Sequence, residues 1–363
     1  MKTKLTLFVA VFATALFGIG CAQLKDAVIG SERKVAIPTV PTVVVSMEHT
    51  NSVYTVTWSP GGKQLATTGA DRTLKIWDGA TGKAIKTIIG PVPELSTRWS
   101  PSVSWSPDGR KIVSNSNDPN GHLRVWDITT GKLIHSIQAH SSYGLGGAWS
   151  PNGKQFGSSG GDAAVRIWNA TTGKKELEMR HGHYAYCMAW SPDGTKIASG
   201  SYDKTLRVWS ADTGKELNRF TGHTGVIRGF SWSPDGTKLA SGGGEGRPTN
   251  DRSLRIWDLA NNKLLYQIDD AHSRDVARVK WSPDGKKIAS TGQDNVLRIR
   301  DAQTGKLLFE QKLSGQDISW HPDSRRLATI HGKAEKNDRT ISIWFIPEKM
   351  ESVSIKPKAN QAR

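Results

Sequence analysis

Short runs of alternating apolar and polar residues, each followed by a turn sequence, succeed one another along most of the chain. The run VYTVTW at residues 53–58 alternates with the period of a half-buried strand, and Ser-Pro-Gly-Gly follows it directly. Proline suits the second position of a type I turn and glycine the fourth, so the chain is expected to reverse into a second strand there. The pattern predicts many short antiparallel strands.

This turn sequence belongs to an internal repeat that is marked by tryptophan. Trp-Ser-Pro, a small or acidic residue and Gly occur together six times, and the weaker form Trp-His-Pro-Asp-Ser occurs once, with the seven copies 39 to 49 residues apart. The tryptophans that open these turns are Trp58, Trp105, Trp149, Trp190, Trp232, Trp281 and Trp320. A second tryptophan follows in runs such as LRVWD, except in the sixth copy, where Arg300 stands. A period of about 40–45 residues is typical of a four-stranded propeller blade.

On these motifs the chain resembles the WD-repeat (WD40-type) family of seven-bladed β-propellers, in an exported bacterial form. The resemblance implies an all-β ring of four-stranded antiparallel blades over residues 38–347. The seventh copy lacks a fourth strand, and TVVVSMEHT at residues 42–50 aligns with the fourth strand of the other copies. We therefore expect the N-terminal strand to close the ring.

A histidine, a serine and an aspartate near Trp209 raise the question of a nucleophilic triad. Histidine and aspartate recur together in four other copies, as His49 with Asp71, His140 with Asp162, His223 with Asp251, and His272 with Asp294. A catalytic site needs one shaped pocket, and a repeat would place this one in five blades. The resemblance implies instead a structural hydrogen-bond relay, which we assign to His183, Ser199, Asp203 and Trp209.

Other chemical motifs are sparse, so we expect a non-catalytic protein with no cofactor and no bound metal. His181 and His183 flank one glycine, but two histidines without a third ligand make a weak metal site. The rival hypothesis is a hydrolase or lyase with its site in the central channel. That enzyme would need polar side chains that converge on the channel from several blades, and the sequence displays no such set.

The N-terminus has the three parts of a secretory signal: Lys2 and Lys4, an apolar run over residues 5–20, and then small residues. We favour a lipoprotein signal over residues 1–21, with Cys21 as the lipidated first residue of the mature chain. Ordinary cleavage after Ala22, which would leave a secreted or periplasmic protein, is the alternative. Residues 22–37 then form a tether, and residues 348–363 a polar, basic tail.

The formal net charge of +16 is concentrated in the repeated turns. Lysine follows the Ser-Pro turns, as at Lys154 after Ser-Pro-Asn-Gly, and the turn between the third and fourth strands, as at Lys83. Both turns lie at the same end of a blade because successive strands alternate in direction. Binding of anionic lipid or polysaccharide by this face is our alternative function, whereas nucleic acid is disfavoured for an exported chain.

The opposite face presents aromatic residues. Six residues before the turn tryptophan, where the family commonly contacts partners, copies two to four have Trp99, Tyr143 and Tyr184. Tyr202 and Arg228 complete our predicted contact set. Aromatic side chains anchor protein interfaces, so the sequence predicts a monomeric propeller at the cell envelope that acts as a scaffold for an unidentified protein partner.

Overall fold

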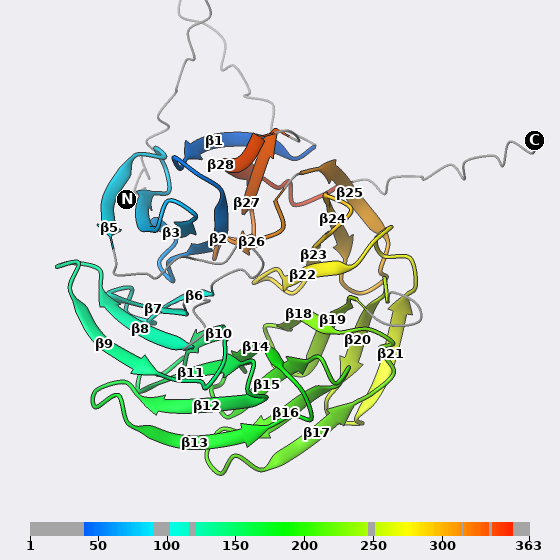
Figure 1. Ribbon diagram of the computed structural model, residues 1–363. Helices are drawn as coiled ribbons and strands as arrows, with labels where there is room; N and C mark the ends of the chain where they lie inside the picture. Colours follow the sequence, from blue (N-terminus) through cyan, green and yellow to red (C-terminus); the bar gives the residue numbers. More distant parts are fainter. Residues whose placement is uncertain are drawn as a thin grey trace, which may run out of the picture. The chain divides into compact units, whose positions relative to one another are not determined.

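The computed structural model describes residues 40–89, 102–115, 121–245, 251–313, 315–333 and 336–350. These residues belong to the second of two compact units, Pro38–Arg363. Every strand in the described ranges belongs to one of seven four-stranded antiparallel sheets (Figure 1). The predicted all-β class and the predicted blade composition are confirmed. No helix in this part of the chain is long and apolar enough to cross a membrane.

Blades 1 to 3 each use four consecutive strands. Blade 1 has β2 (Val53–Trp58), β3 (Gln64–Gly69), β4 (Thr73–Asp78) and β5 (Ala84–Ile89). Blade 2 has β6 (Val103–Trp105), β7 (Lys111–Asn115), β8 (His122–Asp127) and β9 (Leu133–Gln138). Blade 3 has β10 (Gly144–Trp149), β11 (Gln155–Gly160), β12 (Ala164–Asn169) and β13 (Lys175–Arg180).

Blades 4 to 6 repeat this arrangement. Blade 4 has β14 (Ala185–Trp190), β15 (Lys196–Ser201), β16 (Leu206–Ser210) and β17 (Glu216–Phe220). Blade 5 has β18 (Ile227–Trp232), β19 (Lys238–Gly243), β20 (Leu254–Asp258) and β21 (Lys263–Ile268). Blade 6 has β22 (Val276–Trp281), β23 (Lys287–Gly292), β24 (Val296–Asp301) and β25 (Leu307–Lys312).

Blade 7 is built from both ends of the propeller sequence. It combines β26 (Ile318–Trp320), β27 (Arg326–Lys333) and β28 (Lys336–Phe345) with β1 (Thr42–Glu48). β1 runs antiparallel to β28 and places Met47 opposite Ile341. In Figure 1 the blue strand β1 lies beside the red strand β28. The predicted closure by the N-terminal strand is confirmed.

The blades form a ring because their innermost strands contact one another in chain order, from β2 through β6, β10, β14, β18 and β22 to β26, and β26 contacts β2. The apolar core lies between adjacent blades. One cluster joins Ile167 and Met179 of blade 3 to Met188, Ile197 and Trp209 of blade 4. Burial of each such side chain stabilises the fold by about 1.5–3 kcal/mol, so blade-to-blade packing holds the ring together.

The two faces of the ring are defined by different turns. On the turn face, the turn after the innermost strand meets the turn between the third and fourth strands, as where Ala170 N donates to Lys154 O over 2.9 Å. On the loop face, the segment before the innermost strand meets the loop between the second and third strands, as where Tyr202 N donates to Tyr184 O over 2.9 Å. Both predicted pairings are confirmed. Lys287, which the turn pattern would expose, is buried.

Candidate functional site

The predicted hydrogen-bond relay is present and can be followed atom by atom in blade 1. Trp77 Nε1 donates to Thr67 Oγ1 over 2.7 Å, and His49 Nε2 lies 2.6 Å from the same hydroxyl. His49 Nδ1 lies 2.8 Å from Asp71 Oδ2. Because an ionised carboxylate can only accept, Nδ1 carries the proton and Nε2 accepts from the hydroxyl.

The same relay recurs in blades 3, 5 and 6 with serine as the hydroxyl residue. Its histidine and serine pairs are His140 with Ser158, His223 with Ser241, and His272 with Ser290. Blade 6 lacks the tryptophan, and Arg300 in that position donates to the backbone oxygen of Ala271. A relay repeated around the ring is a structural device of the blade.

In blade 4 the relay histidine is His181, which corrects the assignment to His183. His181 Nε2 lies 2.7 Å from Ser199 Oγ, which also accepts a 2.8 Å hydrogen bond from Trp209 Nε1. His181 Nδ1 lies 3.2 Å from Asp203. In every relay the histidine and the hydroxyl residue are 18 positions apart, and His183 is two residues too close to Ser199. This constant spacing is a sequence signal that would have identified His181.

The blade 4 relay is not a catalytic triad. Ser199 is 0% exposed, so its hydroxyl cannot reach a substrate. Burial lowers the pKa of His181 and outweighs the opposing effect of Asp203. Burial alone would raise the pKa of Asp203, but hydrogen bonds from His181 and Thr205 lower it strongly. Arg207 adds a 2.8 Å ion pair to Asp203, so the group is a neutral histidine beside a fully bonded carboxylate.

His183 belongs to a different group, the aromatic patch, which we define as His183, Tyr184 and Tyr202 on the loop face. The His183 ring stacks on Tyr202, with centroids 4.3 Å apart and planes 28° apart, and meets Tyr184 edge-on at 4.4 Å. Tyr184 is 40% exposed and Tyr202 39% exposed. Three adjacent rings therefore contact one another and are exposed to solvent.

The aromatic patch continues inward through two further residues. The ring centroid of buried Tyr186 lies 6.2 Å from that of Tyr202. The Arg228 guanidinium carbon lies 5.5 Å from the centroid of the Tyr186 ring. Arg228 also donates to exposed Glu245 over 3.2 Å. The structure thus brings Tyr184, Tyr202 and Arg228 of the predicted contact set into one connected group.

The other two predicted contact residues stand apart from this group. Tyr143 occupies the equivalent position in blade 3 and is 39% exposed. Among the described residues no ring contact joins it to the aromatic patch. Trp99 and Cys21, which the sequence predicted as a contact residue and as the lipidation site, lie outside the described residues.

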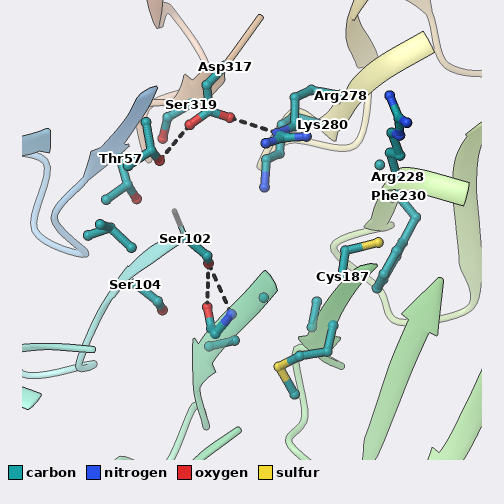
Figure 2. A pocket seen from close by; sticks show the side chains of 18 of the residues that line it. Thr57, Ser102, Ser104, Cys187, Arg228, Phe230, Arg278, Lys280, Asp317 and Ser319 are labelled. Carbon is teal, nitrogen blue, oxygen red and sulfur yellow. Dashed lines mark hydrogen bonds and ion pairs between the residues drawn. The ribbon is translucent and has the colours of Figure 1, made fainter. Parts of the chain in front are cut away.

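A central channel with a cavity of about 260 Å³ runs between the innermost strands, and Figure 2 shows its lining side chains. The residue three positions before every turn tryptophan lines the channel. The residue directly before the tryptophan also lines it in blades 1–4, 6 and 7. Arg228 lies four positions before its tryptophan, at a register shift between Ile227 and Gly229, and a bulge of this kind re-aims a side chain.

Charged side chains converge in this channel, contrary to our expectation from the sequence. Arg228 of β18, Arg278 and Lys280 of β22, and Asp317 beside β26 all line it. Arg278 Nε donates to Asp317 Oδ1 over 3.2 Å. Aligning the positions one and three before each turn tryptophan would have displayed Arg278, Lys280 and Asp317 together.

The chemistry available in the channel is limited. Cys187 lines the channel and is mostly buried, and burial raises the pKa of its thiol to about 12, so the thiol stays protonated and weakly nucleophilic at neutral pH. In the described part of the chain no three His, Cys, Asp or Glu side chains form a metal-binding group. The channel is therefore a polar, cationic cavity, and the loop face carries the aromatic surface.

Seven four-stranded blades, the recurring relay and the tryptophan-marked turns define a WD40-type propeller. A family model described as "WD domain, G-beta repeat" matches residues 42–78, 97–127, 131–169, 174–210 and 214–258, which is more than half of the chain. The chain belongs to this family, whose members are typically protein-interaction scaffolds and generally non-catalytic. A model of the anaphase-promoting complex subunit 4 WD40 domain matches residues 247–321.

Relatives with assigned names match over part of their length. Protein tipD of Dictyostelium discoideum is 35% identical over 132 residues, covering 35% of this chain and 21% of that protein. Nuclear distribution protein PAC1 of Arthroderma otae is 31% identical over 137 residues, covering 36% of this chain and 29% of that protein. Cell division cycle 20.1, cofactor of APC complex, of Arabidopsis thaliana is 29% identical over 125 residues, covering 34% and 26%. The chain thus spans less than a third of each of these relatives.

Proposed function

We propose that the chain is a scaffold that binds a protein partner through the aromatic patch, with Tyr143 of the neighbouring blade as a second contact. The observation that carries the proposal is the group of three mutually packed, solvent-facing rings on the loop face. Tyrosine buries a large area on binding and loses little rotamer freedom, so such groups anchor interfaces. The name of the Arabidopsis relative, a cofactor of a complex, is consistent with a binding role.

We place this scaffold at the cell envelope, anchored by a lipid on Cys21. The support is the N-terminal sequence, in which two lysines, an apolar run and Gly20-Cys21 follow in the order of a lipoprotein signal. A lipid on Cys21, joined to the propeller by residues 22–37, would hold the propeller at the membrane surface.

The test is crosslinking and purification from native cells with a matched pair of double variants. Tyr184→Ala with Tyr202→Ala removes the patch, and Leu264→Ala with Leu265→Ala removes a comparably exposed apolar pair from outer strand β21, where the leucines are 39% and 41% exposed. We expect quantitative mass spectrometry to show a partner that is lost only with the tyrosine variant. Recovery of the same proteins with both variants would exclude the aromatic patch as the partner-binding surface.

Binding of a polyanion is a second candidate, and the exposed lysines of the turn face favour it. Lys63 and Lys83 are exposed at the two turns of blade 1 and Lys154 is exposed in blade 3, with others at equivalent turns. Attraction between exposed charges is screened within about 10 Å at 0.1 M salt. Retention on anionic vesicles that disappears at high salt, and that does not change with the tyrosine variant, would support this candidate.

A further inference from the structure

The channel wall is strongly biased toward positive charge. Its described lining includes three cationic side chains, Arg228, Arg278 and Lys280, and one carboxylate, Asp317. Two of the cations come from the same strand, β22, and Figure 2 shows Arg278 and Lys280 together on one side of the cavity. Low-dielectric walls focus the field of such charges into the enclosed space.

Asp317 is already bonded within the fold and offsets only one of the three cations. Its Oδ2 accepts hydrogen bonds from Thr55 Oγ1 at 2.7 Å and from Val56 N at 3.0 Å, both in blade 1. Its Oδ1 accepts the Arg278 Nε hydrogen bond. The carboxylate therefore joins blade 7 to blade 1 and pairs with one of the three cations.

Lys280 is the channel cation for which the described part of the protein supplies neither a hydrogen-bond acceptor nor an ion-pair partner. Its side chain remains accessible to water inside the channel. Enclosure by the seven strands lowers the pKa of its amine, and Arg278 lowers it further while Asp317 opposes the change. The Lys280 ammonium has three hydrogen-bond donors. An anion bound in the channel would accept from these donors and offset the enclosed positive charge.

The remaining wall is neutral, and its hydroxyl groups bond to the backbone of adjacent blades. Ser319 Oγ accepts from Trp58 N, Ser104 Oγ accepts from Trp149 N, and Ser102 Oγ bonds both N and O of Gly147. These groups give little shape-specific recognition, so charge dominates. A volume of about 260 Å³ is below the usual range for drug-sized ligands.

We propose that the central channel binds the oxyanion of a small molecule, a carboxylate or a phosphate, through the Lys280 ammonium with the Arg278 guanidinium beside it. This site goes beyond the scaffold function, because the residues that hold the anion are separate from the aromatic patch.

The test is a titration of the full chain with inorganic phosphate and with succinate, each against chloride at equal ionic strength, followed by calorimetry and thermal unfolding. We expect saturable binding and a rise in the unfolding temperature. Lys280→Gln should weaken binding roughly tenfold to a hundredfold, the usual loss for one charge-assisted hydrogen bond. Lys280→Arg should retain binding, and Lys154→Gln on the turn face should leave it unchanged.

The arms of the titration distinguish the source of the oxyanion. A stronger response to succinate indicates a carboxylate ligand, and a stronger response to phosphate indicates a phosphate. Lys280 makes no bond that the glutamine would break, so Lys280→Gln should unfold at the wild-type temperature in chloride. No response beyond chloride, or equal affinities for wild type and Lys280→Gln, would overturn the proposal.

Discussion

His181 and His183 are separated by one glycine, yet their environments are opposite. His181 is buried against Ser199 and Asp203, whereas His183 stacks on Tyr202 in solvent. The difference arises because β14 lies between the relay histidine and the hydroxyl residue on β15. Only the histidine 18 positions before Ser199 reaches that hydroxyl. The His-Gly-His sequence at residues 181–183 does not by itself show which histidine has this spacing, so the relay was assigned to the wrong one.

Alanine substitution of each histidine should therefore have different consequences. His181→Ala leaves the Ser199 hydroxyl and the Asp203 carboxylate short of a buried partner, so we expect the free energy of unfolding to fall by about 2–3 kcal/mol. His183→Ala removes an exposed ring contact and should change it by less than about 1 kcal/mol. Urea denaturation of both variants measures the difference. Equal losses would contradict the reassignment.

At the scale of elements, the closing strand β1 makes blade 7 depend on residues that are far apart in the sequence. Met47 of β1 is buried in a cluster with Trp77 of blade 1 and Ile343 of β28. Val44, at the register shift of the same strand, is 54% exposed. The strand was predictable because one copy lacked a fourth strand and an unassigned segment matched it.

Two aspartate substitutions in β1 test the closure. Met47→Asp places an unpaired charge in the core and should lower the free energy of unfolding by at least about 3 kcal/mol. Val44→Asp keeps its charge in water and should have an effect within about 1 kcal/mol. Chemical denaturation followed by tryptophan fluorescence measures both. Deletion of residues 38–48 should abolish cooperative unfolding, and an unchanged single transition would refute the closure.

At the scale of the whole molecule, the described part of the ring contains five relays that respond together to pH. Burial is the main cause of the lowered pKa of His49, His140, His181, His223 and His272. The relay aspartates also have lowered pKa values, and that of Asp71 is about 2. Each folded group resists protonation more than its unfolded counterpart does.

The propeller should therefore lose stability as pH falls. Below about pH 6.5 the unfolded histidines bind protons that the folded ones exclude, and below about pH 4 the aspartates add to the loss. We expect the urea midpoint to decrease from pH 7.5 to pH 5, also at high salt, where repulsion among surface charges is screened. His183→Ala, outside the relay, should show the same slope. A constant midpoint across this range would contradict neutral relay histidines.

The sequence by itself determined the number of blades, their four strands, the closing strand and the histidine–aspartate pairs of four relays, because all of these follow from covalent spacing in a repeat. It also indicated the exposed tyrosines, since they depart from the repeat. Only the tertiary structure decided that His183 joins Tyr184 and Tyr202, and that Arg228 lines the same channel as Arg278, Lys280 and Asp317. The physical reason is ring closure, which brings together side chains from separate blades whose interaction depends on distance in space.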